Sequence, residues 1–197
     1  MPRNLLIATR NKKKRQELHE ILSDCDINLI TLDDVEGIPE IEEDGYTFED
    51  NAIKKASLVA ALSKFITLAD DSGLVVDALD GRPGVFSARF AGINADDEKN
   101  NSKLLTMMQG LREEERTARF VCVIAIADPG GSVQTVQGVC EGRIATFASG
   151  QGGFGYDPLF IPAGLSKSFA ELSDKEKNMI SHRGKALNEA KFLLQRI

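Results

Sequence analysis

Short apolar runs alternate with longer amphipathic stretches along this chain, and the alternation predicts an α/β protein. Residues 5–8 and 27–30 are apolar runs of strand length, while Leu18, Ile21 and Leu22 between them follow helical spacing. A strand, a polar turn and a helix in this order are typical of an α/β opening. We therefore expect two strands separated by one helix at the start of the chain.

The middle of the chain continues this alternation. Thr47 and Asp50 form the pattern of a capping box, which predicts the start of a helix over roughly residues 48–64. A further helix is expected over roughly residues 95–109. Residues 119–127 are apolar almost throughout, so we expect a strand that is covered on both faces.

The last third of the chain predicts a long strand and two helices. Residues 133–147 have strand character, although Gly138 and Gly142 indicate bulges or a bend. A second capping box at Ser173 and Glu176 predicts a helix, and apolar residues at helical spacing predict a closing amphipathic helix after it.

Composition narrows the class of protein. The 197 residues can bury a sizeable core, and 24 Lys and Arg against 30 Asp and Glu give a net charge of −6. We therefore expect no nucleic-acid binding through a global basic field. The three cysteines form no C-x-x-C pair, which suggests a reducing compartment and argues against zinc. No apolar run suits a signal peptide or membrane helix, so we expect a cytoplasmic protein without membrane contact.

Two adjacent carboxylates, Asp70 and Asp71, stand where the apolar run 65–69 ends. Neighbouring carboxylates repel each other and are tolerated best beside a cation or a shared proton. Because oxygen ligands suit a hard ion, the pair predicts a Mg²⁺ site. The alternative is a solvated turn between two strands, at residues 65–69 and 74–76.

A basic turn follows the first strand. Residues 10–15 contain five cations, and the side chains of Thr9 and Asn11 can form hydrogen bonds beside them. Since free N–H groups at a helix start favour anions, we interpret this turn as a phosphate site. A lysine run on a solvated helix face is the plainer interpretation.

Residues 149–158 form a glycine-rich segment with a formal G-x-G-x-x-G at Gly150, Gly152 and Gly155. The dinucleotide-binding fingerprint requires a helix next, whereas an apolar run follows here, so we reject that interpretation. We expect instead a close backbone approach and an aromatic ring that stacks on a flat ligand such as a base. A glycine-rich hairpin loop is the alternative.

Further charges have two interpretations each. His182 and Arg183 lie at a predicted junction between helices, where they could form a cap or a surface pair. Together with Lys177 they could instead read a base or phosphate through charge-assisted bonds. The acidic stretch 36–44 could be solvated loop charge, or it could supply a metal ligand.

Each motif is weak alone, but six of them follow one another in the order of a known family. The chain resembles the inosine triphosphate pyrophosphatase family from about residue 5 to residue 195. The six matching blocks are A-T-x-N-x-x-K-x-x-E at 8–17, T-F-E-x-N-A at 47–52, A-D-D-S-G-L at 69–74, P-G-V-F-S-A-R at 83–89, G-G-F-G-Y-D-P at 152–158 and S-H-R-G at 181–184.

This resemblance implies one α/β domain over residues 1–197, with a long mixed, strongly twisted central sheet flanked by helices. It implies two lobes with the active-site cleft between them. The implied reaction is Mg²⁺-dependent hydrolysis of ITP, dITP and XTP to the nucleoside monophosphate and pyrophosphate, which keeps deaminated purines out of DNA and RNA. The resemblance also implies a homodimer.

The resemblance also implies roles for individual residues. Asp71 matches the catalytic carboxylate that holds Mg²⁺ and activates water, and Asp70 assists it. Glu43 matches a metal-binding glutamate, although the adjacent Glu42 leaves the register open. The residues implied to contact substrate are Thr9, Arg10, Asn11, Lys12, Lys13, Lys14, Ser72, Phe154, Gly155, Tyr156, Asp157, Lys177, His182 and Arg183.

Base selection follows from the same assignment. Cationic donors from Lys177, His182 or Arg183 would face the six-position carbonyl of hypoxanthine. They would oppose the amino group of adenine, and unpaired buried donors are unfavourable.

Three other functions fit parts of the sequence. A Maf-like pyrophosphatase with another nucleotide preference would share the broad fold, but the S-H-R-G and G-G-F-G-Y-D segments argue against it. A nucleotide-binding module without catalysis would not need the Asp70 and Asp71 pair. RNA binding through residues 12–15 is disfavoured by the net acidity and by the lack of a second basic patch with aromatics.

Overall fold

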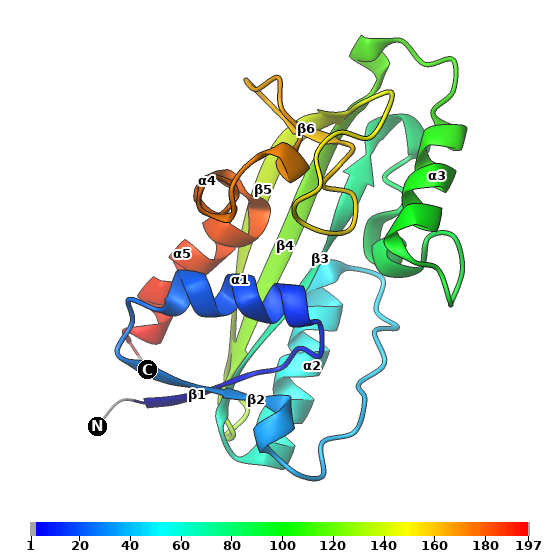
Figure 1. Cartoon of the computed structure of the whole chain (residues 1–197). Coiled ribbons are helices and arrows are strands. Elements are labelled where there is room, and N and C mark those ends of the chain that lie inside the picture. The colour runs from blue at the N-terminus through cyan, green and yellow to red at the C-terminus, as the bar shows by residue number, and fades with distance from the viewer. Residues whose placement is uncertain (1–2, 197) are drawn as a thin grey trace. The chain divides into compact units, whose positions relative to one another are not determined.

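The computed structural model of this chain describes residues 3–196 (Figure 1). Its strands are β1 (Arg3–Ile7), β2 (Ile27–Thr31), β3 (Ile66–Val76), β4 (Thr117–Ala127), β5 (Val133–Ile144) and β6 (Phe160–Pro162). Its α-helices are α1 (Lys12–Leu22), α2 (Phe48–Ser63), α3 (Asp97–Met107), α4 (Asp174–Ile180) and α5 (His182–Leu194). Within the described residues, none of these helices has the length and apolar character needed to cross a membrane.

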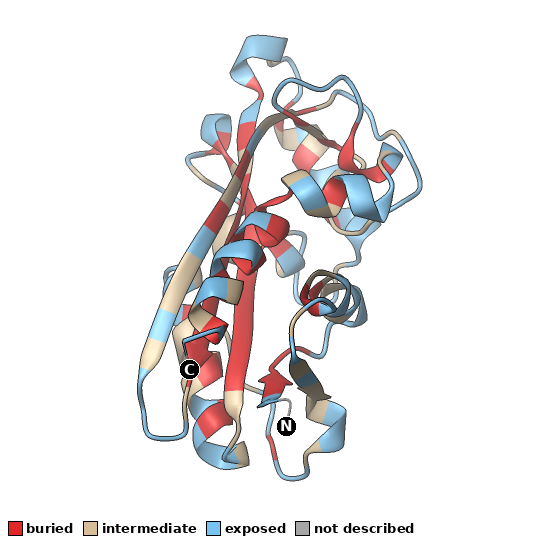
Figure 2. Ribbon diagram, turned by 90° about the vertical axis from the view of Figure 1, so that its left-hand side faces the viewer, coloured by how far each residue is buried: buried red, intermediate tan, exposed pale blue. Residues whose placement is uncertain are grey.

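One mixed sheet contains these strands in the order β2-β1-β3-β4-β5-β6. Strand β1 pairs in parallel with β2 and with β3, whereas β5 and β6 are antiparallel. The α/β class and the mixed sheet are therefore confirmed. Strand β4 is buried over most of its length while β5 alternates (Figure 2), so the expectation that residues 119–127 are covered on both faces is confirmed.

Strand β3 is longer than the hydrophobic pattern predicts. It runs from Ile66 to Val76 through both aspartates. Asp70 and Asp71 are 1% and 5% exposed, so the alternative of a solvated turn is wrong. Strand pairing uses backbone hydrogen bonds, which do not depend on side-chain polarity. Strand β3 therefore continues between its neighbouring strands although the apolar pattern of its sequence stops.

The chain divides into two compact units, each built from several segments. Of the described residues, unit 1 comprises 3–71, 122–138 and 183–196, and unit 2 comprises 72–121 and 139–182. Strands β3, β4 and β5 therefore each contribute residues to both units. The two units correspond to the two implied lobes, while the cleft and the single domain stay predictions.

Unit 1 has hydrophobic clusters on both faces of its strands. Leu68 of β3 packs with residues of α1 and α5, whereas the neighbouring Ala69 packs with residues of α2. Successive side chains of a strand point to opposite faces. The same alternation directs Asp70 toward the face of α1 and α5 and directs Asp71 toward the face of α2.

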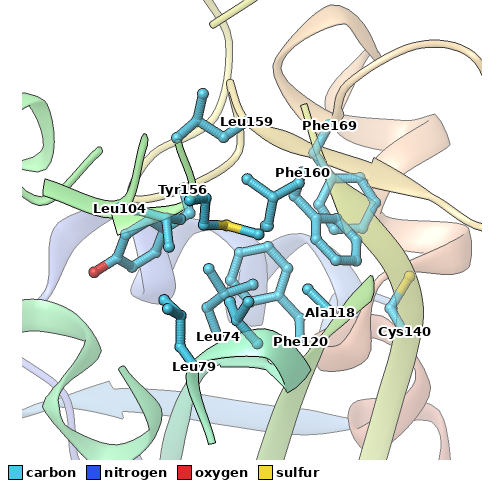
Figure 3. Close-up of a cluster of buried hydrophobic side chains, with 13 residues drawn as sticks. Leu74, Leu79, Leu104, Ala118, Phe120, Cys140, Tyr156, Leu159, Phe160 and Phe169 are labelled. Atoms are coloured by element: carbon cyan, nitrogen blue, oxygen red, sulfur yellow. The ribbon is translucent and has the colours of Figure 1, made fainter. Parts of the chain in front are cut away.

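Unit 2 is organised around the aromatic cluster of Figure 3. The ring of Phe120 meets Phe160 edge to face at 4.7 Å between centroids and stacks with Phe169 at 5.9 Å. The ring of Tyr156 belongs to the cluster, and the Tyr156 hydroxyl points away from the other side chains (Figure 3). This hydroxyl donates a 2.8 Å hydrogen bond to the Ser87 carbonyl. The cluster therefore anchors the segment between β5 and β6.

Candidate active site

Asp71 is a buried carboxylate in an acidic environment. Its Oδ2 accepts a 2.9 Å hydrogen bond from Nδ2 of Asn51, a buried residue of α2. Burial and the negative charge of Glu43 raise the pKa of the Asp71 carboxyl above its ordinary value, against smaller opposing effects. A carboxylate in this state accepts a proton or a cation more readily than a solvated aspartate does.

Asn51 also binds the loop that follows Glu43. Its Oδ1 accepts a 2.7 Å hydrogen bond from the backbone N–H of Gly45. A Cβ atom at Gly45 would lie 2.7 Å from that oxygen, so a side chain there would displace the contact. No role of Asn51 was predicted from the sequence, although the residue stands in the T-F-E-x-N-A block.

Lys55 is a second residue of α2 whose contacts at the site were not predicted from the sequence. Its Nζ forms an ion pair with Glu43 and donates a 2.7 Å hydrogen bond to the backbone carbonyl of Asp70. Burial opposes the charge of Lys55, but Asp70 and Glu43 outweigh it and raise the pKa of this amine. Glu43 is half-buried in this arrangement while Glu42 is exposed, so the structure joins Glu43 to the Asp71 site.

Asp70 has the opposite environment. Its Oδ2 lies 3.0 Å from Lys14 Nζ and 3.3 Å from Arg183 Nη2. Burial alone would raise the pKa of this carboxyl, but the positive charges of Lys14, Arg183 and Lys55 outweigh it and hold the pKa well below its usual range. Asp70 is therefore charged at neutral pH and orients two cations, while its expected part in binding Mg²⁺ stays a prediction.

Arg183 and His182 are both buried, at 1% and 4% exposure, so the interpretation as a surface pair is wrong. Arg183 pairs with Glu17 of α1 as well as with Asp70. The His182 ring stacks on Phe120 with 4.6 Å between ring centroids. The two residues are adjacent in sequence, but Arg183 makes its contacts in unit 1 and His182 makes its contact in unit 2.

The basic turn leads into the N-terminus of α1. Asn11 is the N-cap, and its Oδ1 accepts hydrogen bonds from Lys13 N at 3.0 Å and Lys14 N at 3.1 Å. Thr9 is buried, and its hydroxyl accepts from Asn11 N at 3.2 Å. The first turns of α1 and α5 contain no acid, whereas those of α2, α3 and α4 each contain two. A helix start without acids favours an external anion.

The five cations of residues 10–15 are not equivalent. Lys14 binds Asp70, Arg15 binds Asp33 at 2.6 Å, and Arg10 donates to the Ile38 carbonyl at 3.1 Å. Lys12 and Lys13 are exposed. The interpretation as a solvated lysine face therefore holds for these two exposed lysines only.

The other group of predicted residues lies in unit 2, on the 153–157 loop and α4. Lys177 Nζ lies 2.6 Å from Asp157 Oδ2, and both side chains are buried. The same amine lies 4.8 Å from the centroid of the Phe154 ring, and Asp157 also accepts a 2.8 Å hydrogen bond from Phe154 N. An aromatic ring, a cation and an acid are therefore gathered in one place.

Glycine is required in this loop. Gly153 has φ +69°, and a Cβ atom there would lie 2.0 Å from Asp157 Oδ2. The loop connects the antiparallel strands β5 and β6, and β6 follows it rather than a helix. The rejection of the dinucleotide fingerprint is thereby confirmed, and the hairpin alternative correctly describes the connection. Ser72, the remaining predicted contact, is half-buried in β3.

The fit of Mg²⁺ depends on Glu43 and Asp71. Within residues 3–196, no group of three or more His, Cys, Asp or Glu side chains is arranged to hold a metal ion. Mg²⁺, however, is usually bound through one or two carboxylates together with water and substrate phosphates. The raised pKa of Asp71, caused by burial and by Glu43, is the electrostatic state that a cation relieves. These two carboxylates fit a magnesium ion shared with a phosphate ligand.

Comparisons with known proteins cover nearly the whole chain. A family model described as the Ham1 family matches residues 5–192. The chain is 53% identical over 193 residues to a dITP/XTP pyrophosphatase of Desulforamulus reducens, covering 98% of this chain and 96% of that protein. A Geobacter sulfurreducens protein of the same name is 52% identical over 183 residues, covering 93% and 92%. The solved structure of a HAM1 protein from Coxiella burnetii matches with TM-score 0.90 and 40% identity, over 99% and 100% of the two chains.

Proposed function

The chain belongs to the Ham1 family, and we propose that it hydrolyses dITP, ITP and XTP to the nucleoside monophosphate and pyrophosphate. The observation that carries the proposal is the buried carboxylate of Asp71, which Asn51 holds by a hydrogen bond and whose pKa is raised. It lies in the same unit as the N-terminus of α1, whose first turn contains no acid. Such an activity would remove deaminated purines from the nucleotide pool, so we expect the enzyme in the cytoplasm.

The triphosphate would bind at the start of α1. Thr9, Asn11 and Lys14 form the turn there, and Asp70 and Glu17 keep the cations of Lys14 and Arg183 in fixed positions. Fixed positive groups stabilise a highly charged substrate better than mobile ones because they need no reorganisation. This part of the site would act on any nucleoside triphosphate.

Asp71 would act as the general base. Its carboxylate accepts a proton from a water molecule, which adds across the bond between the α- and β-phosphates, and pyrophosphate leaves. Asn51 keeps the carboxylate in one orientation through the 2.9 Å hydrogen bond. The raised pKa of Asp71 brings the group closer to neutral pH, where proton acceptance is more effective.

Glu43 and Asp71 are the residues that would hold Mg²⁺. When bound, the ion would neutralise phosphate charge and acidify the attacking water. Lys55 holds Glu43 by an ion pair. Lys55 is itself held by its hydrogen bond to the backbone carbonyl of Asp70.

The base would bind in unit 2, against the 153–157 loop. The Phe154 ring offers a stacking surface, and Lys177, held by Asp157, offers a charged donor to the six-position carbonyl of hypoxanthine or xanthine. Adenine carries an amino group at that position, so the same donor would be left unpaired. Selection against ATP would follow from this difference.

Pyrophosphate release from dITP, ITP, XTP, ATP, GTP and UTP, each with and without Mg²⁺, tests this function. We expect fast Mg²⁺-dependent release from dITP, ITP and XTP and slow release from ATP. Preference for UTP would overturn the assignment of the base site. Tight nucleotide binding without release from any of them would favour a binding module instead.

The homodimer implied by the resemblance is part of the proposal. Light scattering during size-exclusion chromatography measures the mass directly. A mass of twice that of the 197-residue chain is expected, and the mass of one chain at micromolar concentration would contradict the dimer.

A further inference from the structure

We propose that Asp97 and Asn101 of α3 are positioning residues that set the shape of the 153–157 loop and thereby the selectivity for the base. The proposal rests on the proposed function, because it concerns the same loop. Neither residue belongs to any of the six sequence blocks, and the nearer of the two, Asn101, lies 54 positions before the residue it contacts.

Both residues bind the backbone of Gly155, one at its N–H and the other at its carbonyl. The backbone N–H of Gly155 donates a 2.7 Å hydrogen bond to Asp97 Oδ2. The backbone carbonyl of Gly155 accepts a 2.9 Å hydrogen bond from Asn101 Nδ2. Since residues four apart lie on one face of a helix, α3 presents an acceptor and a donor together to one residue of the loop.

Gly155 is a residue whose conformation has to be selected. Its φ is +61°, in the left-handed region, and glycine moves between left- and right-handed conformations with little preference. Hydrogen bonds to both its N–H and its carbonyl hold one conformation. Gly155 lies between Phe154 and Tyr156, so this conformation sets the path of the backbone from Phe154 to the anchored Tyr156.

Other contacts hold the neighbours of Gly155 in the loop. Tyr156 is anchored through its hydroxyl on Ser87, and Asp157 is held by Lys177. Phe154 N donates to Asp157 within the loop itself. The contacts from Asp97 and Asn101 therefore fix the turn between the ring of Phe154 and the anchored Tyr156.

The state of the Asn101 amide supports a positioning role. Within the described residues, its Oδ1 is buried and has no hydrogen-bond partner, while its Nδ2 serves Gly155. The donor of this amide is thus committed to the loop backbone.

Asn100 provides a matched control on the same helix. Asn100 is buried whereas Asn101 is half-buried, and the Asn100 side chain accepts from Ala91 N at 2.8 Å and donates to the Ala88 carbonyl at 3.2 Å. These contacts stabilise the segment before α3 and do not involve the 153–157 loop. A purely structural effect of losing an asparagine from α3 should therefore be as large at Asn100 as at Asn101.

The test compares Asp97→Ala, Asn101→Leu and Asn100→Leu with the wild-type enzyme on dITP and dATP, with thermal unfolding as a control for folding. We expect Asp97→Ala and Asn101→Leu to raise KM for dITP and to lower the dITP-to-dATP ratio of kcat/KM by about tenfold, with kcat changed less than about threefold. Asp97→Asn keeps an acceptor oxygen and should restore the ratio. Asn100→Leu should lower the unfolding temperature and leave the ratio unchanged.

A second measurement does not depend on activity. The chain has no tryptophan, so Phe154→Trp places a single tryptophan in the loop, and its fluorescence reports on this loop. Adding Asn101→Leu should lower its steady-state anisotropy, whereas adding Asn100→Leu should not.

An unchanged ratio in both Asp97→Ala and Asn101→Leu, or an equal change in Asn100→Leu, would overturn the inference. Asp97 is exposed, so Asp97→Ala should fold even if Asn101→Leu does not, and the test can then be made with Asp97→Ala alone. Failure of the wild-type enzyme to release pyrophosphate from dITP would instead overturn the proposed function, and the fluorescence comparison would still decide the positioning role.

Discussion

The two units surround their charged groups in different ways. In unit 1, Asp70 and Asp71 are neighbours on one strand, and one is bound by two cations while the other lies beside an acid. In unit 2, the Lys177 and Asp157 pair is buried among aromatic rings, those of Phe154 and Phe169. Charge is thus arranged for a charged ligand in unit 1 and for a flat polar ligand in unit 2.

This difference indicates a division of tasks. Every nucleoside triphosphate carries the same phosphates, so changes in unit 1 should affect all substrates alike. Between dITP and dATP only the base differs, so changes at the Lys177 pair should affect the ratio of these two substrates. The predictions below test this division.

The largest effect is expected for Asp71→Asn. Loss of a general base usually slows a reaction by about 10² to 10⁴-fold, and dITP and dATP should be slowed equally. Steady-state pyrophosphate release at saturating Mg²⁺ measures it, with Asp26→Asn, an exposed aspartate of the same unit, as the control for the change in charge. Near-normal turnover by the Asp71 variant would remove this residue from the mechanism.

Asp70→Asn should act on stability instead. Removing one member of a buried ion pair leaves the partners unpaired and usually costs about 3–5 kcal/mol of unfolding free energy. Urea unfolding at pH 7 measures the change. A loss as small as that of an exposed aspartate would show that Lys14 and Arg183 do not depend on Asp70.

The pH dependence follows from the same ion pairs. The pKa of Asp70 is lower in the folded protein than in the unfolded chain, so its ionisation stabilises the fold above about pH 4. This contribution is lost as the pH falls further, toward the folded pKa. Asp70→Asn cannot titrate, so its stability should decrease less than that of the wild type between pH 7 and about pH 3. An identical decrease would assign the acid sensitivity to other groups.

Glu43→Gln and Glu42→Gln form a matched pair with the same change in charge. Glu43 pairs with Lys55 beside Asp71, whereas Glu42 is exposed. We expect Glu43→Gln to raise the Mg²⁺ concentration for half-maximal activity by about 10 to 100-fold, and Glu42→Gln to leave it near the wild-type value. Magnesium titrations of dITP hydrolysis compare the two, and equal shifts would refute the assignment of Glu43.

Lys177→Met should produce a smaller but more selective effect. Loss of the charged donor should reduce the dITP-to-dATP ratio of kcat/KM by about tenfold, with dATP hydrolysis little changed. Arg183→Ala is the contrasting variant, because its guanidinium binds Asp70 and Glu17. Arg183→Ala should destabilise the protein and leave the ratio unchanged; a large change in ratio would show that Arg183 reads the base.

Most of the fold could be predicted from the sequence, because most of its elements are marked by local sequence patterns. The strands and helices have apolar residues at clear strand or helix spacing, and the Thr47 and Ser173 capping boxes mark two helix starts. Strand β3 was the exception, because its polar centre, from Asp70 to Ser72, ends the apolar pattern although the backbone pairing continues. Polar residues inside a buried strand are recognisable only once their partners are known.

The partners are the part that sequence could not supply. Asn51 meets Asp71 from 20 positions away, and Arg183 meets Asp70 from 113 positions away. The opposite roles of two adjacent aspartates follow from the alternation of side chains in β3 and from which helix covers each face. Asp97 and Asn101 gave no signal at all, since their contacts are to the backbone of another segment.

The most direct test is single-turnover hydrolysis of dITP and dATP, with enzyme in excess, by the wild type, Asp71→Asn and Lys177→Met. Excess enzyme allows slow variants to be measured on the same scale. The account predicts that Asp71→Asn slows both nucleotides by one common factor and that Lys177→Met reduces mainly the preference for dITP. A changed preference in Asp71→Asn, or equal slowing of both nucleotides in Lys177→Met, would contradict the division between the two units.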